Sequence, residues 1–111
     1  MDITLNVVGN VNQVNLKGNF DISASQQFDD KLTSLINDGA NRIILDFSEV
    51  PFIASTGLRV LLKTAQRLKD ENGLLRICGV NETVMEVFKM TSFDTILAIF
   101  DTKEEAMVGM E

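Results

Sequence analysis

The sequence predicts an α/β fold with a mixed, mostly parallel sheet, an N-terminal hairpin and about four helices, in the order ββαβαβαβα. Two strand patterns with alternating apolar and polar residues open the chain on either side of a Gly9-Asn10 turn. From Ser23 onward, helical patterns alternate with short apolar runs, which is typical of parallel strands joined by helices. The pattern does not decide whether the helices cover one face of the sheet or both. A length of 111 residues suits a single domain, residues 1–111.

Each element has its own local signal. Ser23 and Gln26 form a capping-box pair at the start of the first helix, and Asn81 and Thr102 are predicted to cap the last two. Glycine in Asp38-Gly39 and in Asn72-Gly73 predicts the ends of the first two helices. The expected bounds are, in chain order, Ile3–Val8, Val11–Leu16, Ala24–Asn37, Arg42–Asp46, Thr56–Glu71, Leu74–Cys78, Glu82–Met90, Ile96–Phe100 and a short helix after Thr102.

The composition indicates a globular protein and argues against several kinds of partner. Hydrophobic residues make up 45% of the chain, enough for a core. The net charge of −6 argues against binding to nucleic acid or to an anionic membrane surface. No apolar run approaches the roughly 20 residues that a membrane-spanning helix needs, and no signal peptide opens the chain. We therefore expect a cytoplasmic protein that binds neither nucleic acid nor membrane.

The chain lacks most of the residues that enzymes use. It has no histidine and a single cysteine, so serine–histidine and cysteine–histidine catalysis are excluded, and so are thiolate and imidazole metal sites. Cys78 lies in an apolar strand pattern, where we expect a small buried side chain and not a nucleophile. We predict that the protein is not an enzyme and holds neither a metal nor a cofactor.

The segment around Ser55 stands between the central strand and the second helix. Pro51 ends the strand pattern, and apolar residues then recur at helical spacing at Leu58, Leu61, Leu62, Ala65 and Leu68. Ser55 is therefore a candidate N-cap, or lies immediately before one. Its hydroxyl would lie near free backbone N–H groups at the positive end of the helix, a favourable place for a phosphate. From the local pattern alone, the favoured interpretation is a serine that only caps the helix.

The string Phe-Ile-Ala-Ser-Thr-Gly-Leu, residues 52–58, resembles the signature of the STAS domain, which occurs in bacterial anti-sigma factor antagonists and in the tails of sulfate transporters. The turn from Gly18 to Asp21 resembles the family's Gly-x-[Leu/Ile/Phe]-Asp, and the element order agrees over essentially the whole chain. The resemblance implies a STAS fold. It also implies that Ser55 is phosphorylated by a partner kinase, and that Asp21 lies near this phosphoacceptor.

The resemblance further implies a binding switch of the anti-sigma factor antagonist type. Such a protein docks on an anti-sigma factor that is also a serine kinase and so releases a sigma factor. Phosphorylation of Ser55 ends the docking, and a serine phosphatase restores it. We expect the partner to contact Asp21, Ser55, Thr56, Gly57 and Arg59.

Each of these residues has a role that the residues themselves suggest. Gly57 would leave the site uncrowded for a partner, and Arg59, one helical turn after Ser55, could reach a phosphate. Thr56 is the alternative acceptor. The structural alternatives are a turn aspartate at Asp21 that bonds its own backbone, and a solvated helix face at Arg59.

Two other functions stay open. Ala54 stands where the family usually has an acidic residue. This departure raises the alternative of a STAS subunit that is never phosphorylated and acts as a scaffold in a stressosome-like or lipid-transport complex. The second alternative is a small phosphotransfer enzyme that uses Cys78 or an aspartate, which the thiol's reactivity would test.

Overall fold

The computed structural model describes residues 1–110, in which five strands form one sheet in the order β1-β2-β3-β4-β5. β1 pairs antiparallel with β2, and all other neighbours are parallel. The predicted mixed, mostly parallel sheet with an N-terminal hairpin is therefore confirmed. The strands are β1 (Asp2–Val8), β2 (Val11–Lys17), β3 (Arg42–Glu49), β4 (Leu74–Cys78) and β5 (Ala98–Phe100), and the helices are α1 (Ile22–Asn37), α2 (Ser55–Asp70), α3 (Glu82–Met90), a 3₁₀ helix (Phe93–Thr95) and α4 (Lys103–Met107).

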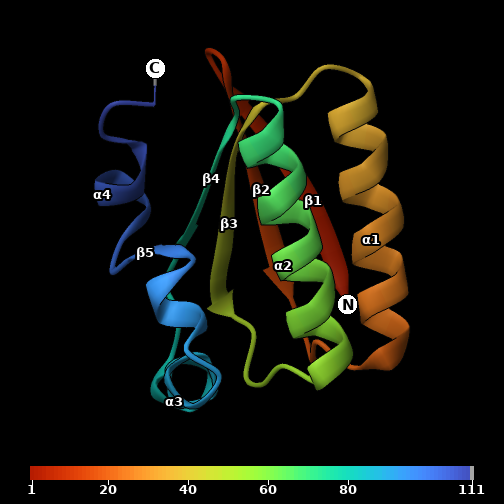
Figure 1. The fold of residues 1–111 in the computed structure, drawn as a ribbon, viewed down its shortest axis with the longest axis vertical. Helices are drawn as coiled ribbons and strands as arrows, with labels where there is room; N and C mark the ends of the chain where they lie inside the picture. Colours follow the sequence, from red (N-terminus) through yellow and green to blue (C-terminus); the bar gives the residue numbers. More distant parts are fainter. Residues whose placement is uncertain (111) are drawn as a thin grey trace.

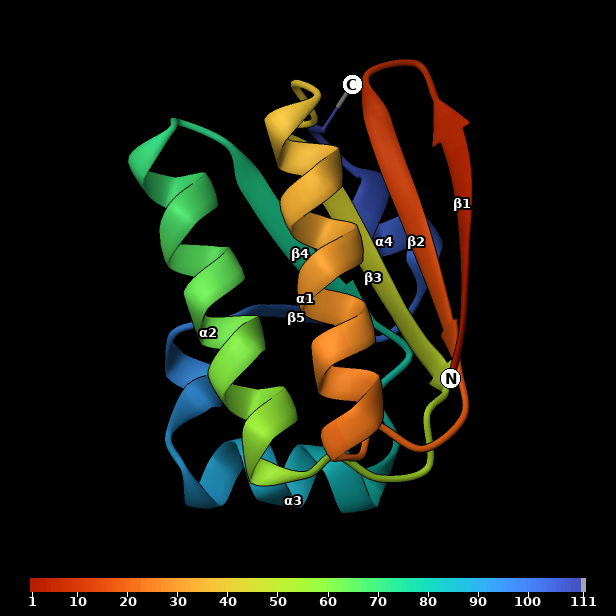
Figure 2. The same ribbon diagram turned by 90° about the vertical axis from the view of Figure 1, so that its right-hand side faces the viewer.

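Helices lie on both faces of the sheet. α1 and α2 run side by side over one face, and α4 covers part of the other (Figures 1 and 2). α3 runs across the edge of the sheet at which β3 ends, below the N-terminal ends of α1 and α2 (Figure 2). That edge gathers the segments that the sequence analysis singled out.

The alternation of side chains along β3 divides the core into two clusters. Ile43, Leu45 and Phe47 are fully buried on the α1 and α2 side, together with Phe20 and Phe28. The ring of Phe20 is the centre of this aromatic group, with its centroid 5.1 Å from that of Phe28 and 6.0 Å from that of Phe47. The smaller cluster, between the sheet and α4, contains Val11, Ile44, Cys78, Ala106 and Met110.

Several predicted boundaries were wrong. α1 begins at Ile22 and its N-cap is Asp21, not Ser23, because Asp21 Oδ1 accepts a hydrogen bond of 2.9 Å from the N–H of Ala24. At the end of α2 the left-handed residue is Asn72, with φ of 60°, instead of Gly73. Gly73 is needed for space, since a Cβ there would lie 2.6 Å from the carbonyl oxygen of Asn41.

The last strand is shorter than the apolar run predicted. A 3₁₀ turn precedes it, Ile96 is 57% exposed, and only Ala98–Phe100 pairs with β4. The predicted caps at Asn81 and Thr102 are confirmed, since their side chains accept from the backbone N–H groups of Val84 and Glu105. No helix within residues 1–110 is long and apolar enough to cross a membrane.

Candidate functional site

The first turns of α1 and α2 meet at the edge of the sheet where β3 ends. A short parallel bridge between Phe20 and Ile53 joins the two segments that lead into these helices. The N–H of Phe20 donates to the carbonyl of Phe52 at 3.2 Å, and the N–H of Ala54 donates to the carbonyl of Phe20 at 2.8 Å. Asp21 and Ser55 directly follow these bonds, so main-chain pairing brings both candidate residues to the same edge.

Ser55 is the first residue of α2 and its side chain is exposed. The predicted capping role is wrong, because the N-cap is Ala54, whose backbone is extended at φ −79° and ψ 163° and whose side chain makes no capping bond. The carbonyl of Ala54 accepts the first helical bond, 3.1 Å from the N–H of Leu58. Ser55 therefore lies one position inside the helix, where its hydroxyl is not needed to begin it.

The helix end at Ser55 is electrostatically suited to an anion. The N–H groups of Ser55, Thr56 and Gly57 have no acceptor within the helix. The first turn of α2 carries no acidic residue. A phosphate on the Ser55 hydroxyl would lie at the positive end of this 16-residue helix, which stabilises negative charge by typically 0.3–1 kcal/mol at an exposed position.

The two hydroxyl groups of the motif have different environments. The Oγ1 of Thr56 lies 2.9 Å from the Oγ of Ser25, a residue that is only 4% exposed. The Ser25 hydroxyl donates its own proton to the carbonyl of Asp21 at 2.7 Å, so the proton between the two hydroxyls comes from Thr56. Thr56 thus links α2 to α1, whereas Ser55 faces outward. This difference favours Ser55 over Thr56 as the acceptor of a phosphate.

Gly57 is buried, and the reason for the glycine lies inside the domain. A Cβ at this position would lie 2.6 Å from Cδ1 of Phe20 and 2.8 Å from Cγ1 of Ile53. We expected the missing side chain to leave room for a partner, but the space is filled by this packing. Gly57 therefore allows the first turn of α2 to approach the aromatic core.

Arg59 is exposed on α2, one turn after Ser55. It forms no ion pair with any other residue in the range 1–110. Lys63, on the next turn, is instead paired with Asp29 of α1 at 3.0 Å. Of these two basic side chains, Arg59 is the one available to a charged group near Ser55, and its contact with a partner stays a prediction.

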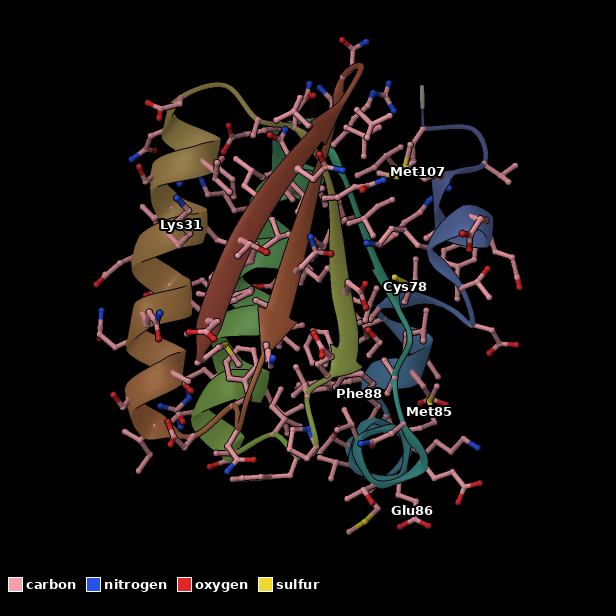
Figure 3. The ribbon with its side chains drawn as sticks, turned by 180° about the vertical axis from the view of Figure 1, so that it is seen from behind. Lys31, Cys78, Met85, Glu86, Phe88 and Met107 are labelled. Carbon is pink, nitrogen blue, oxygen red and sulfur yellow. The ribbon has the colours of Figure 1, made fainter. Side chains whose placement is uncertain are left out.

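The other chemically notable side chains lie on the α4 side of the sheet, away from Ser55. Burial raises the pKa of the Cys78 thiol to about 11, and Cys78, 1% exposed, belongs to the small cluster between the sheet and α4 (Figure 3). Burial also acts to raise the pKa of Asp46, but the Ser48 N–H at 2.9 Å and the Lys103 ammonium at 3.2 Å outweigh it and lower that pKa. The predicted burial of Cys78 is confirmed, and a thiol that stays protonated is a poor nucleophile.

No group of three or more potential metal-ligating side chains occurs within the part of the chain that the structure describes. Two hydrogen-bonded contacts of the site are not predicted by the sequence. One is the Ser25–Thr56 bond, and the other is the side chain of Asn81, whose Nδ2 donates to the carbonyls of Val50 and Pro51. Asn81 was predicted only as a cap, since bonds to residues 30 and 31 positions away leave no local signal.

Comparison with known proteins identifies the family. The family model for the STAS domain matches residues 2–106. The anti-sigma-B factor antagonist of Bacillus subtilis is 32% identical over 102 residues, covering 89% of this chain and 92% of that protein. The chain belongs to the STAS domain family, as its sequence resemblance implied.

Solved structures agree with this assignment. A crystal structure from Thermotoga maritima, assigned as an anti-sigma factor antagonist, superposes with a TM-score of 0.93 at 27% identity over 97% of this chain and 93% of that one. The Bacillus cell fate determinant SpoIIAA in its phosphorylated form superposes with a TM-score of 0.75 at 25% identity, over 96% of each chain. Relatives over nearly the full length are thus named as anti-sigma factor antagonists.

Proposed function

We propose that the protein is an anti-sigma factor antagonist and a phosphorylation-controlled binding switch. The observation that carries the proposal is the exposed Ser55 at the first position of α2, beside free N–H groups and with no acidic neighbour in the first turn. In its unphosphorylated form the protein docks on an anti-sigma factor through the surface around Ser55, with Asp21, Thr56 and Arg59 at its margin. Docking releases a sigma factor, and the antagonist catalyses no reaction itself.

The switch follows from the charge of a phosphate group. Phosphorylation adds about −1.5 to −2 charges and three oxygen acceptors to a side chain that is exposed in the free protein. In a docked complex those oxygens would lose water, which is costly unless the partner supplies a cation. In the free protein they remain hydrated and the end of α2 stabilises them. Phosphorylation therefore shifts the equilibrium toward the free form.

The partners are an anti-sigma factor that acts as the serine kinase and a serine phosphatase that reverses the modification. Support comes from the names of the relatives and from the phosphorylated form of SpoIIAA, which shares the fold. The net charge of −6 argues against a nucleic-acid target for the antagonist itself. The switch would act in the cytoplasm, where sigma factors work.

One observation favours a second candidate function. Ala54 leaves the helix start without the acidic side chain that the family usually places there. A STAS subunit that is never phosphorylated could use the same surface as a scaffold in a larger assembly. The two functions differ in one measurable quantity, the incorporation of phosphate at Ser55.

The test begins with capture of partners on the wild-type protein from a lysate of the source organism, and identification of a histidine-kinase-like ATPase by mass spectrometry. The purified ATPase is then incubated with the antagonist and ATP, and the modified peptide is mapped. We expect phosphate on Ser55, none in Ser55→Ala, and normal incorporation in Thr56→Ser, which keeps the bond to Ser25. Stable binding without phosphate incorporation would favour the scaffold, and phosphate on Thr56 would contradict the assignment.

A further inference from the structure

The side chain of Asn81 connects α3 to the loop of residues 50–54, which leads into Ser55. Its Oδ1 accepts a bond of 2.8 Å from the N–H of Val84, which caps α3. Its Nδ2 donates to the carbonyl oxygens of Val50 and Pro51, each at 3.2 Å. One amide group therefore begins a helix and holds a loop that lies about 30 residues earlier in the chain.

The loop between β3 and α2 is held from two sides. On the α1 side, main-chain bonds from Phe20 fix Phe52 and Ala54. On the α3 side, a hollow of about 520 Å³ is bordered by Lys17 and Glu49 and by Pro51 and Asn81. Val50 and Ile53 anchor the loop in the core, being 1% and 6% exposed. Pro51 between them is exposed beside the hollow, and the Asn81 amide is the side chain that bonds the loop there.

The orientation of α3 makes this connection rigid. Phe88 is fully buried, and it points toward the core, whereas Glu86 points away (Figure 3). Val84 is fully buried as well. The N-terminal end of α3, and with it Asn81, is thus anchored in the core that also supports β3.

We propose that Asn81 is a positioning residue for Ser55, which holds residues 50–54 against α3 so that the Ser55 hydroxyl has one orientation relative to both helices. The inference deepens the proposed function and rests on it. Without the amide bonds the loop keeps its attachment to Phe20 and the buried side chains of Val50 and Ile53, but the carbonyls of Val50 and Pro51 lose their bonds to α3 and the Ser55 hydroxyl samples additional orientations. A kinase then finds the reactive geometry less often, although the contacts by which it docks are unchanged.

Three variants separate the positioning role from capping and from charge. Asn81→Ser keeps a good N-cap residue, but its side chain is too short to reach the loop. Asn81→Asp keeps the cap and the side-chain size, but it replaces the amide donor by a carboxylate that faces two carbonyl oxygens. Thr83→Asp is the matched control. Thr83 is exposed on the first turn of α3, so this variant adds the same charge nearby and leaves the Asn81 bonds intact.

The first measurement uses the protein alone. Amide hydrogen exchange is followed by NMR at Ala54, whose N–H donates to the carbonyl of Phe20, and at Leu58, whose N–H donates to the carbonyl of Ala54. We expect exchange about three- to tenfold faster in Asn81→Ser and Asn81→Asp, the range that one lost hydrogen bond produces, and no change in Thr83→Asp. The amide of Ser25, which bonds to the carbonyl of Asp21 at 2.9 Å, should exchange at the wild-type rate in all variants.

The second measurement is the steady-state rate of Ser55 phosphorylation by the ATPase identified above. We expect kcat to fall about fivefold in both Asn81 variants with KM within about twofold, because positioning affects the reacting geometry more than docking. Thr83→Asp should leave kcat unchanged.

The inference is overturned if both Asn81 variants match the wild type in exchange and in kcat. It is equally overturned if Ser25 exchanges faster in step with Ala54, since the effect would then be general destabilisation. Failure of the proposed function has a different signature, the absence of phosphate on wild-type Ser55. In that event the exchange measurement still decides whether Asn81 holds the loop.

Discussion

Replacement of Ala54 by aspartate should affect the unphosphorylated and phosphorylated proteins differently. Ala54 is the N-cap of α2 and supplies no side-chain bond to the free N–H groups of the first turn. Aspartate at this position would accept from one of them and place a negative charge at the positive end of the helix. We expect Ala54→Asp to stabilise the unphosphorylated protein by about 1 kcal/mol, equivalent to about 4 °C in Tm for a chain of this length.

Phosphate on Ser55 should remove much of that gain. At about 6 Å and an effective dielectric constant near 20, two unit charges interact by roughly 3 kcal/mol, which solvent and salt at this exposed end reduce to about 1 kcal/mol. The coupling between Ala54→Asp and phosphorylation should therefore be about 1 kcal/mol and unfavourable.

The assay is a double-mutant cycle on four species, wild type and Ala54→Asp with and without phosphate on Ser55, melted or unfolded in urea. Ala54→Asn is the matched control, since asparagine caps as well as aspartate but carries no charge. Its gain should be the same in both phosphorylation states. No stabilisation of the unphosphorylated protein by either variant would refute the assignment of Ala54 as the cap. Equal coupling for the two variants would refute the electrostatic argument.

Three further predictions follow from the site and the core. Ser55→Asp should weaken binding to the captured ATPase about tenfold or more, measured by calorimetry. Ser55→Ala should bind normally and change stability by less than about 0.5 kcal/mol, because Ser55 is not the cap. Equal affinities of the two variants for the ATPase would contradict the charge switch. Gly57→Ala should lower the free energy of unfolding in urea by about 1–3 kcal/mol through overpacking against Phe20, and an unchanged value would show that the first turn shifts without cost. The pKa of Asp46 is lower in the folded state than in the unfolded state, where it is near 3.9. The ionised carboxylate therefore stabilises the fold at pH values above about 3.9, and this contribution is lost as the pH falls through the lower pKa of the folded state. Asp46→Asn should therefore cost about 1–2 kcal/mol at pH 7, and its difference from the wild type should shrink below about pH 4; a difference independent of pH would exclude the pairing with Lys103 as its cause.

Local signals in the sequence were sufficient for the order and type of the elements. The turn at Gly9-Asn10 and the alternation on either side of it predict the hairpin, and the caps at Asn81 and Thr102 are short-range hydrogen bonds that the side chains largely dictate. The bounds of β4 and α3 agree with the prediction for the same reason. The motif around Ser55 identified the family, which the comparisons confirm. The phosphorylation of Ser55 stays a prediction.

Long-range contacts decided the rest. In the continuous apolar run of Ile43, Ile44 and Leu45 no residue indicates which face it occupies, so the placement of helices on both faces became visible only in the structure. The start of α2 depends on a main-chain bond between Ala54 and Phe20, residues 34 positions apart, which helps make Ala54 the cap instead of Ser55. The type of a polar side chain shows that it can cap a helix or form a hydrogen bond. Which group it bonds to is determined by the packing of segments that are distant in the sequence.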